Sequence, residues 1–469
     1  MSENSLQKLM DDFSLESVPK DSRRPWTEIA AVQVGIVSSL AVLMTGGLVT
    51  FMAGFWMGML AAFCAFIIST VFIFFMGMIS YSEGYSSNII SRAYAFGTKG
   101  SAIGSLIWAF MIIGFLGLEN VLIGHSLLFY FGIEKTTAIN VIMYILMAVF
   151  WIVLSLFGIK LVAKVAQLTI PILFIVLGYI VYLLVEQGNF SEVFSFGVMI
   201  PGLPLSAGFG IALNATITLA GLITIVATDF TRFARSKKDV LKVSVSSGVA
   251  MYGLTMFFGA VITYFGHTLS KSYFVNQGMS EAEAINAAIV NPGITLVLAG
   301  GVIGMLAIIF SQAKVQVGNS YEGALALVNL FDVLFKWTPG RAVMVVFANI
   351  ISLIFIFGNI LHYIEMFLAI GSVLLGVWVI IVLTDYYLIK GKLGIGDRGI
   401  SDLKNIRNFN FNGIATLIVS TSVGMVIHVQ GWFSVPFIIS ILVAFVMYTS
   451  IAIFTNNKQA VLEERKANV

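Results

Sequence analysis

Apolar segments long enough to cross a lipid bilayer recur along almost the whole chain. A transmembrane helix needs about 20 mostly apolar residues, and a membrane strand about half as many. Segments of the longer kind cover 27–53, 56–80, 102–131, 138–158, 165–186, 206–228, 243–267, 294–326, 341–360, 362–388, 411–429 and 432–455. Within a bilayer, a single segment can satisfy all of its own backbone hydrogen bonds only as a helix. The sequence therefore predicts an all-α integral membrane protein with twelve transmembrane helices.

The composition excludes a soluble fold. Hydrophobic residues make up 59% of the chain and charged residues only 10%, whereas a soluble domain carries about 25% charged residues. Much of the surface must therefore contact lipid. Residues 1–26 are polar and of mixed charge, without the short apolar core of a signal peptide. We expect them to form a cytoplasmic tail.

The basic residues gather on one side of the predicted membrane. If the N-terminus is cytoplasmic, only Lys135 and Lys271 of the 26 lysine and arginine residues fall in outer loops, and only Lys314 lies inside a span. Positive charge is retained on the cytoplasmic side of membrane proteins, and one span more or fewer would destroy the asymmetry. We expect a multi-pass protein of the inner (cell) membrane with both termini cytoplasmic. Because the basic residues line cytoplasmic loops, they give no reason to expect a nucleic-acid partner.

Two spans that are five apart combine glycine with hydroxyl and amide side chains. Span 1 contains GIVSSLAVLMTGG (35–47), and span 6 contains GFGIALNATITLAGLITIVATDF (208–230). Such residues allow a helix to unwind inside a membrane, and broken helices at matching places in two halves are typical of inverted-repeat transporters. The pattern favours breaks in helices 1 and 6. It also fits plain helix packing through small residues, which stays open as the alternative.

Two ionisable residues lie in the middle of spans. Glu119 stands in GFLGLENVLIG of span 3, and Lys314 in FSQAKVQVGNSYEG of span 8. A charge at this depth is costly unless it is paired or hydrated, so intramembrane charges mark functional sites. We interpret Glu119 as a ligand or proton site and as the counter-ion of Lys314, with a purely structural ion pair as the alternative. The role of Asn359, His362 and Glu365, near the outer end of span 10, stays open between a site and a solvated interfacial cluster.

Other function classes find little support in the sequence. The chain has one cysteine, Cys64, and it lacks a nucleophile elbow, a phosphate loop and any metal-ligand spacing. We therefore expect no enzymatic activity, no cofactor and no bound metal. A ligand-sensing receptor would need a signalling domain, for which the tail 456–469 is too short.

Five motifs follow one another along the chain, namely TGG (45–47), RAYAFGTKGS (92–101), ATDFTRFARSKKDV (227–240), NSYEGALALVN (319–329) and TDYYLIK (384–390). Together and in this order they resemble the nucleobase–cation symporter family, which includes purine–cytosine permeases, cytosine permeases and hydantoin transporters. The resemblance includes, at 227–240, the family's Asp-aromatic-x-Arg-aromatic junction after span 6. It implies a leucine-transporter-like fold with a five-plus-five inverted repeat, broken helices 1 and 6 and two further C-terminal helices. It also implies uptake of a planar heterocycle by alternating access, usually with a coupling cation.

On this basis the chain divides into five parts. Residues 1–26 form the N-terminal tail, 27–186 the first repeat with helices 1–5, and 187–390 the second repeat with helices 6–10. Residues 391–455 contain a cytoplasmic loop and helices 11 and 12, and 456–469 form the cytoplasmic tail.

The resemblance also suggests a substrate site. Phe115 falls where the family often stacks an aromatic side chain on the substrate, and Glu119, one turn later, falls where hydantoin transporters carry glutamine. An ionised carboxylate only accepts hydrogen bonds, so the ligand should present N–H donors or a positive charge. The other expected substrate contacts are Ser38 and Ser39 in span 1, Thr218, Ala220 and Gly221 in span 6, and Gln316 and Ser320 in span 8.

The cation site implied by the resemblance is altered. Family members that use sodium hold it between carbonyl groups of span 1 and two neighbouring hydroxyl groups of span 8. The hydroxyl pair corresponds here to Lys314 and Val315. We assign the coupling ion, or the group that replaces it, to Gly35, Ser39, Ser311 and Lys314.

The presence of Lys314 predicts transport that does not depend on sodium. The ammonium group can lose and regain a proton during the cycle, which would make H⁺ the coupling ion. It can also stay a permanent cation, which would give facilitated or exchange transport. Two alternatives stay open, a sodium-coupled nucleobase symporter and a transporter of the same fold for an organic cation or amine.

Overall fold

The computed structural model describes residues 13–134, 136–156, 158–186, 189–200 and 202–467. Within these residues the regular secondary structure is helical and contains no β-strand. The first half contains α2 (Trp26–Val37), α3 (Leu40–Glu83), α4 (Ser87–Ser91), α5 (Ser101–Phe131), α6 (Thr137–Leu156), α7 (Gly158–Val185) and α8 (Leu205–Thr231). The second half contains α9 (Lys237–Gly248), α10 (Met256–Asn276), α11 (Glu281–Val290), α12 (Pro292–Gly300), α13 (Val302–Phe335), α14 (Arg341–Phe357), α15 (Ile364–Leu383), α16 (Phe411–Gln430) and α17 (Pro436–Ala467).

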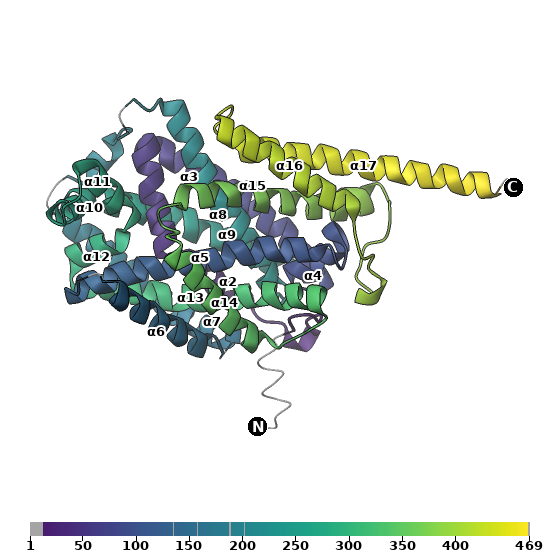
Figure 1. Cartoon of the computed structure of the whole chain (residues 1–469), viewed down its shortest axis with the longest axis horizontal. Helices are drawn as coiled ribbons and strands as arrows, with labels where there is room; N and C mark the ends of the chain where they lie inside the picture. The colour runs from purple at the N-terminus through teal and green to yellow at the C-terminus, as the bar shows by residue number, and fades with distance from the viewer. Residues whose placement is uncertain (1–12, 135, 157, 187–188, 201, 468–469) are drawn as a thin grey trace, which may run out of the picture.

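Short 3₁₀ and π segments connect or extend these helices. The 3₁₀ turns are η1 (Lys20–Ser22), η3 (Phe190–Ser195) and η6 (Leu403–Asn405), and the π segments are η2 (Arg92–Phe96), η4 (Val249–Thr255) and η5 (Thr384–Lys392). Figure 1 shows α11 and α12 at one end of the molecule and α4 at the opposite end, with α5 and α8 between them.

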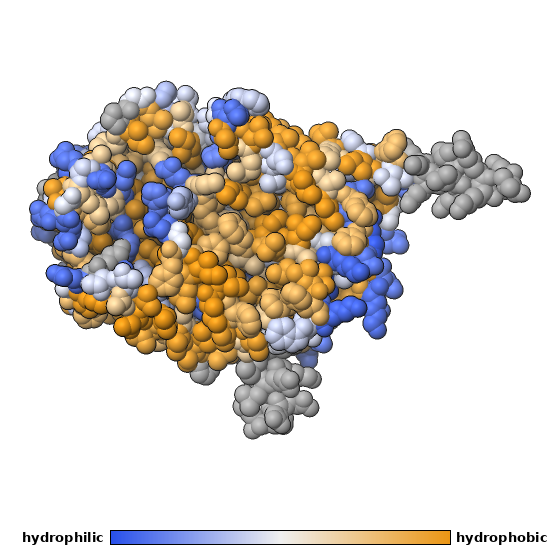
Figure 2. Space-filling model, viewed as in Figure 1, coloured by the Kyte–Doolittle hydropathy of each residue, from blue (hydrophilic) through white to orange (hydrophobic). Residues whose placement is uncertain are grey.

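The described residues contain ten helices that are long and apolar enough to cross a membrane, or eleven if the bent pair α11 and α12 is counted as one more span. Figure 2 shows a broad apolar belt between two ends where hydrophilic residues gather. The prediction of an all-α, multi-pass membrane protein is confirmed. The count of twelve stays a prediction, because α2 and α14 are shorter, with 12 and 17 residues, and α3 continues for 44 residues through two predicted spans.

The chain leaves the helical path inside span 1 at Ser38 and Ser39. Ser38 has φ −91° and ψ 57°, and Ser39 is extended with φ −110° and ψ 164°. The Ser39 hydroxyl accepts the Val42 N–H at 3.1 Å and so caps α3, the role for which serine is favoured at this position. A second interruption lies at Gly54, whose φ of 75° permits a bend between the predicted spans 1 and 2.

The predicted break in span 6 is wrong, since α8 is continuous from Leu205 to Thr231. The hydroxyl groups of Thr224, Thr228 and Thr231 each donate to the carbonyl four residues earlier and so stay within the helix. Gly208 lies against the Met52 carbonyl and allows α8 to approach α3 closely. The small and polar residues of this span therefore serve packing, the alternative that the sequence left open.

Span 8 begins later than predicted. Gly301 has φ 52° and separates α12 from α13, so residues 294–300 belong to α12, which forms with α11 a pair bent by 86°. Asn359, His362 and Glu365 are exposed between α14 and the first turn of α15. Their exposure fits the solvated cluster better than a buried site.

Candidate functional site

Glu119 of α5 lies at the break of span 1. Its carboxylate accepts the Ala41 N–H at 3.2 and 3.3 Å and Gln312 Nε2 of α13 at 3.0 Å. The Ser39 hydroxyl also lies within hydrogen-bonding reach of it. Ala41 is the second residue of α3, where an N–H has no partner inside the helix and the helix dipole favours an anion. The carboxyl group of Glu119, which is 1% exposed, therefore lies where the start of α3 favours a negative charge.

The ammonium group of Lys314 is buried and forms its hydrogen bonds with its own helix, α13. Its Nζ donates to the carbonyl groups of Phe310 at 2.9 Å and Ser311 at 3.1 Å. Neither Lys314 nor Glu119 takes part in an ion pair among the described residues. The two groups act on each other electrostatically but form no salt bridge with each other, because Glu119 accepts donors from Ala41 and Gln312 and the ammonium donates to carbonyl groups within α13. The role of Glu119 as the counter-ion of Lys314 therefore stays a prediction.

The Lys314 side chain nevertheless lies at the predicted cation position. A Cβ atom at Gly35 would stand 3.3 Å from Lys314 Cδ, so the missing side chain of Gly35 makes room for the lysine. The Ser311 hydroxyl donates to the Ser38 carbonyl at 2.7 Å. Of the predicted set, the structure thus brings Gly35, Ser311 and Lys314 close to one another. The fourth residue, Ser39, instead caps α3 and lies within reach of Glu119.

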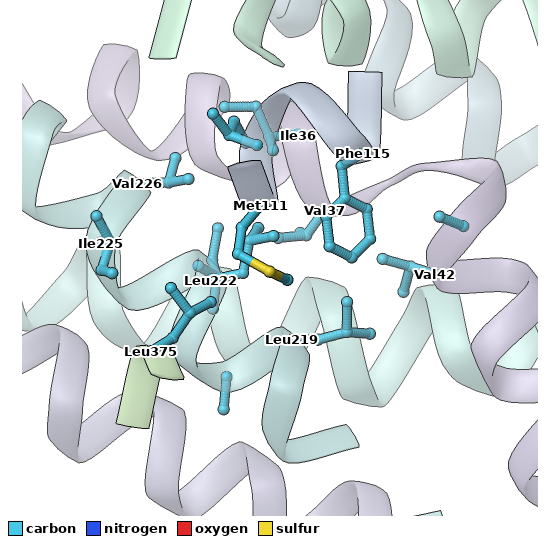
Figure 3. Packing of buried hydrophobic residues seen from close by; sticks show 14 of the residues in the cluster. Ile36, Val37, Val42, Met111, Phe115, Leu219, Leu222, Ile225, Val226 and Leu375 are labelled. Carbon is cyan, nitrogen blue, oxygen red and sulfur yellow. The ribbon is translucent and has the colours of Figure 1, made fainter. Parts of the chain in front are cut away.

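Phe115 lies one helical turn before Glu119 on α5. Figure 3 shows its ring in an apolar layer with Val42 of α3, Met111 of α5 and Leu219 of α8. Its ring centroid is 5.3 Å from that of Phe367 on α15, at an interplanar angle of 59°. Phe115 and Glu119 thus lie one turn apart on α5, where i and i+4 positions share a face, and both lie near residues that flank the break of span 1. Their joint role in substrate binding stays a prediction.

The three residues of span 6 that were expected to contact the substrate, Thr218, Ala220 and Gly221, lie away from the break of span 1 in their observed contacts. The Thr218 hydroxyl donates to the Leu368 carbonyl of α15 at 2.6 Å. A Cβ atom at Gly221 would lie 2.9 Å from Leu375 of α15, and Ala220 is completely buried. Thr218 and Gly221 thus join α8 to α15, and their observed contacts do not involve the break of span 1.

Gln316 and Ser320 also bond to neighbouring helices. Gln316 Nε2 donates to Asn120 Oδ1 at 2.6 Å and to the Leu116 carbonyl of α5 at 3.2 Å. Ser320 accepts a hydrogen bond from Asn349 of α14 at 3.1 Å. The amide that reaches Glu119 is instead Gln312, one turn earlier on α13 than Gln316. Sequence reasoning did not assign Gln312 to the site, although an amide four residues before Gln316 shares its helix face.

The junction after span 6 forms a cap at the opposite side of the core from α11 and α12. Both carboxylate oxygens of Asp229 accept hydrogen bonds from Ser87 at the start of α4, from its N–H and its hydroxyl. Arg232 donates to the Asp229 carbonyl at 2.9 Å and to the Phe13 carbonyl at 2.7 Å. These bonds join the C-terminal end of α8 to α4 and to the segment around Phe13.

Comparison with known proteins gives a family match over most of the chain. Residues 17–453 match the family described as "Permease for cytosine/purines, uracil, thiamine, allantoin". The purine-uracil permease NCS1 of Arabidopsis thaliana is 24% identical over 410 residues, which are 83% of this chain and 66% of the plant protein. The chain thus spans slightly less than two thirds of the length of this relative.

Solved transporters have a similar fold. Mhp1, a nucleobase-cation-symport-1 family transporter in a closed conformation with bromovinylhydantoin bound, has a TM-score of 0.69 at 18% identity, over 94% of this chain and 95% of its own. Mhp1 in its inward-facing conformation gives the same TM-score at 17% identity, over 95% of each chain. A sodium-coupled sialic acid symporter gives 0.64 at 12% identity, over 96% of this chain and 95% of its own.

These similarities confirm the expected fold class. At such low identities the structural likeness establishes the fold alone, whereas the sequence match over residues 17–453 also establishes the family. The protein belongs to the family of permeases for cytosine and purines, uracil, thiamine and allantoin, a family of membrane transporters rather than enzymes.

Proposed function

We propose that the protein imports a nucleobase or a related small N-heterocycle across the cytoplasmic membrane by alternating access, without sodium. The observation that carries this proposal is the position of Glu119 and Phe115 beside the break of span 1. A planar ring can stack on the aromatic face while its N–H groups donate to the carboxylate. Family membership supports the class of substrate.

Glu119 favours a neutral N–H donor over an anionic substrate. In the present conformation its carboxylate accepts the Ala41 N–H and the Gln312 amide. A substrate N–H can replace or join these donors, because a carboxylate has about four acceptor positions. An anion would meet a negative charge already placed at the start of α3.

Lys314 supports a mechanism that does not use sodium. Its aliphatic chain fills the space beside Gly35, and Ser311 uses the Ser38 carbonyl as its acceptor. A metal ion at this place would have to displace both groups and would also meet the lysine charge. The ammonium therefore takes the role that the resemblance gives to sodium, either as a proton carrier or as a permanent cation.

We further propose an orientation in the inner membrane with both termini cytoplasmic and with the repeats at 27–186 and 187–390. The distribution of lysine and arginine supports the orientation. The ends that carry α4 and the pair α11 and α12 would then face the cytoplasm and the outside, respectively.

Uptake into proteoliposomes tests the substrate class. Labelled cytosine, uracil, purines and hydantoins would be compared in the wild type, Glu119→Gln and Glu119→Ala, with primary amines as competitors. We expect uptake of at least one heterocycle, altered ring preference in Glu119→Gln and a loss of about 10- to 100-fold in Glu119→Ala, the equivalent of one charge-assisted hydrogen bond. Uptake that amines inhibit and heterocycles do not would instead establish the organic-cation alternative.

A further inference from the structure

Two buried carboxyl groups face each other between α8 and α13. Asp229, in the last turn of α8, and Glu322 of α13 are both 0% exposed, and their carboxyl groups lie within hydrogen-bonding reach of each other. This cluster lies apart from the candidate substrate site. The substrate mechanism makes no use of Glu322.

The hydrogen-bond donors around the pair are unevenly distributed. Asp229 accepts the N–H and the hydroxyl of Ser87, whereas neither carboxylate oxygen of Glu322 receives a donor from the described residues. The buried indole N–H of Trp108 on α5 faces Glu322 but has no well-formed hydrogen bond of its own. Two carboxyl groups can bond to each other only if one of them carries a proton.

The burial of the pair favours that proton. Arg232, one turn after Asp229, acts electrostatically on both carboxyl groups, and its guanidinium also donates to the Phe13 carbonyl and lies 3.4 Å from the Tyr321 hydroxyl. Two ionised carboxylates side by side in this buried place would repel each other, and the low dielectric makes that repulsion costly.

The other charged groups nearby have partners of their own. The Arg341 guanidinium of α14 lies 5.1 Å from the centre of the Tyr321 ring. Arg92 of η2 forms an ion pair with Asp332, further along α13. Tyr321 itself stacks on Phe230 of α8 at 5.6 Å. Among the described residues, Arg232 is therefore the charged group that acts on both members of the pair.

We propose that Asp229 and Glu322 hold one shared proton while the α4 end of the transporter is closed, and that release of this proton accompanies opening of that end. The pair and its partners tie α8 to α13, α4 and the segment around Phe13. Once both carboxyl groups are ionised, water must enter to stabilise the second charge, and water enters only if these elements separate. The coupling to transport rests on the proposed alternating-access function, whereas the proton site itself does not.

Cysteine accessibility measures this opening without any substrate. In a Cys64→Ala background, Val226→Cys places one thiol on α8, at a buried position one turn before Asp229. The labelling rate by a membrane-impermeant maleimide, applied from the α4 side, would be measured as a function of pH on that side. Dividing it by the rate for Asp397→Cys, in the exposed loop before α16, removes the pH dependence of the thiol chemistry.

We expect the normalised labelling rate to rise with pH. The increase should approach about tenfold per pH unit, because opening releases one proton. Glu322→Gln keeps a donor for Asp229 but cannot ionise, so its normalised rate should be low and independent of pH. Asp229→Asn, a second variant of the pair, should also lose the slope. Asp397→Asn, the control, removes an exposed carboxylate and should retain the pH dependence of the wild type.

A slope in Glu322→Gln equal to that of the wild type would overturn the proposal. Infrared spectroscopy of the wild type gives an independent test, since a protonated carboxyl group absorbs at a different frequency from an ionised carboxylate. A spectrum without a buried protonated carboxyl group under closed conditions would overturn the proposal as well. Absence of heterocycle uptake with the slope intact would refute the proposed substrate and leave the proton site standing.

Discussion

At the scale of single residues, Glu119 connects the backbone of the broken span to two other helices. Its carboxylate holds the Ala41 N–H, which α3 cannot satisfy itself, and the Gln312 amide of α13. A buried N–H without an acceptor costs about 1–3 kcal/mol. The same carboxylate therefore serves the stability of the break and, in our proposal, the recognition of the substrate.

Because Glu119 has this double role, two substitutions at this position should differ in their effect on stability. Glu119→Leu removes the acceptor and should lower the free energy of unfolding by about 1–3 kcal/mol. Glu119→Gln retains one carbonyl oxygen for Ala41 and should lose less. Thermal unfolding of both variants in one detergent checks the order, and equal stability of Glu119→Leu and the wild type would contradict the assigned hydrogen bonds.

We expect Lys314 to lower the free energy of unfolding relative to an apolar residue at this position and to be needed for transport. Its ammonium is buried and donates to carbonyl groups of its own helix, and it forms no salt bridge within the described part of the chain. An apolar side chain of similar length removes the cost of burying the charge, so Lys314→Met should keep or raise the free energy of unfolding, by up to about 4 kcal/mol. The same variant should lose transport.

Thermal unfolding and uptake, measured on the same preparation of Lys314→Met, check both expectations. Lys314→Arg, which keeps the charge but enlarges the head group, serves as the control. A clear loss of stability together with normal uptake in Lys314→Met would refute the role that we assign to the lysine.

At the scale of helices, similar sequence patterns lead to different backbones in spans 1 and 6. Around Ser38 and Ser39 the freed backbone groups find partners far along the chain, because Glu119 accepts the Ala41 N–H and Ser311 donates to the Ser38 carbonyl. In α8 the threonine hydroxyls bond within the helix itself. Glycine and hydroxyl content predicts where a helix can break, and tertiary partners decide whether it does.

Glycine packing gives a prediction at this scale. A Cβ atom at Gly46 of α3 would clash with the backbone carbonyl of Met256 on α10, which cannot move alone. Gly46→Ala should therefore lower the free energy of unfolding by about 1–3 kcal/mol. Gly178 on α7 has open space instead, and Gly178→Ala should raise stability by about 0.5–1 kcal/mol. Thermal unfolding that ranks these two variants in the opposite order would show that the close approach of α3 and α10 is misplaced.

At the scale of the whole molecule, hydropathy predicted the class and the family motifs predicted the fold. The apolar segments and the motif ATDFTRFARSKKDV (227–240) sufficed for a membrane transporter of this family. The start of span 8 was misplaced because Gly301 interrupts an apolar stretch that hydropathy reads as continuous. The site was predicted only in part, since Gln312 and Gln316 share one helix face and side-chain partners alone distinguish their roles.

The proposed orientation predicts where reporters are active. Two kinds of reporter protein would be fused to each end of the chain, one active only in the cytoplasm and one active only outside it. We expect the cytoplasmic reporter to be active at both ends, because this orientation places nearly all lysines and arginines inside. A fusion within 268–280, in the predicted outer loop, is the matched outside control. Activity of the two terminal fusions on opposite sides would require an odd number of spans and would refute the count of twelve.

The sodium dependence of uptake tests the central claim most directly. Uptake of the transported heterocycle would be measured in proteoliposomes with and without an inward sodium gradient, at fixed pH and with potassium as the replacement ion. With Lys314 beside Gly35, in the place where related transporters are expected to hold sodium, we predict equal uptake in both conditions. Uptake that rises severalfold with the sodium gradient in the wild-type protein would contradict this account.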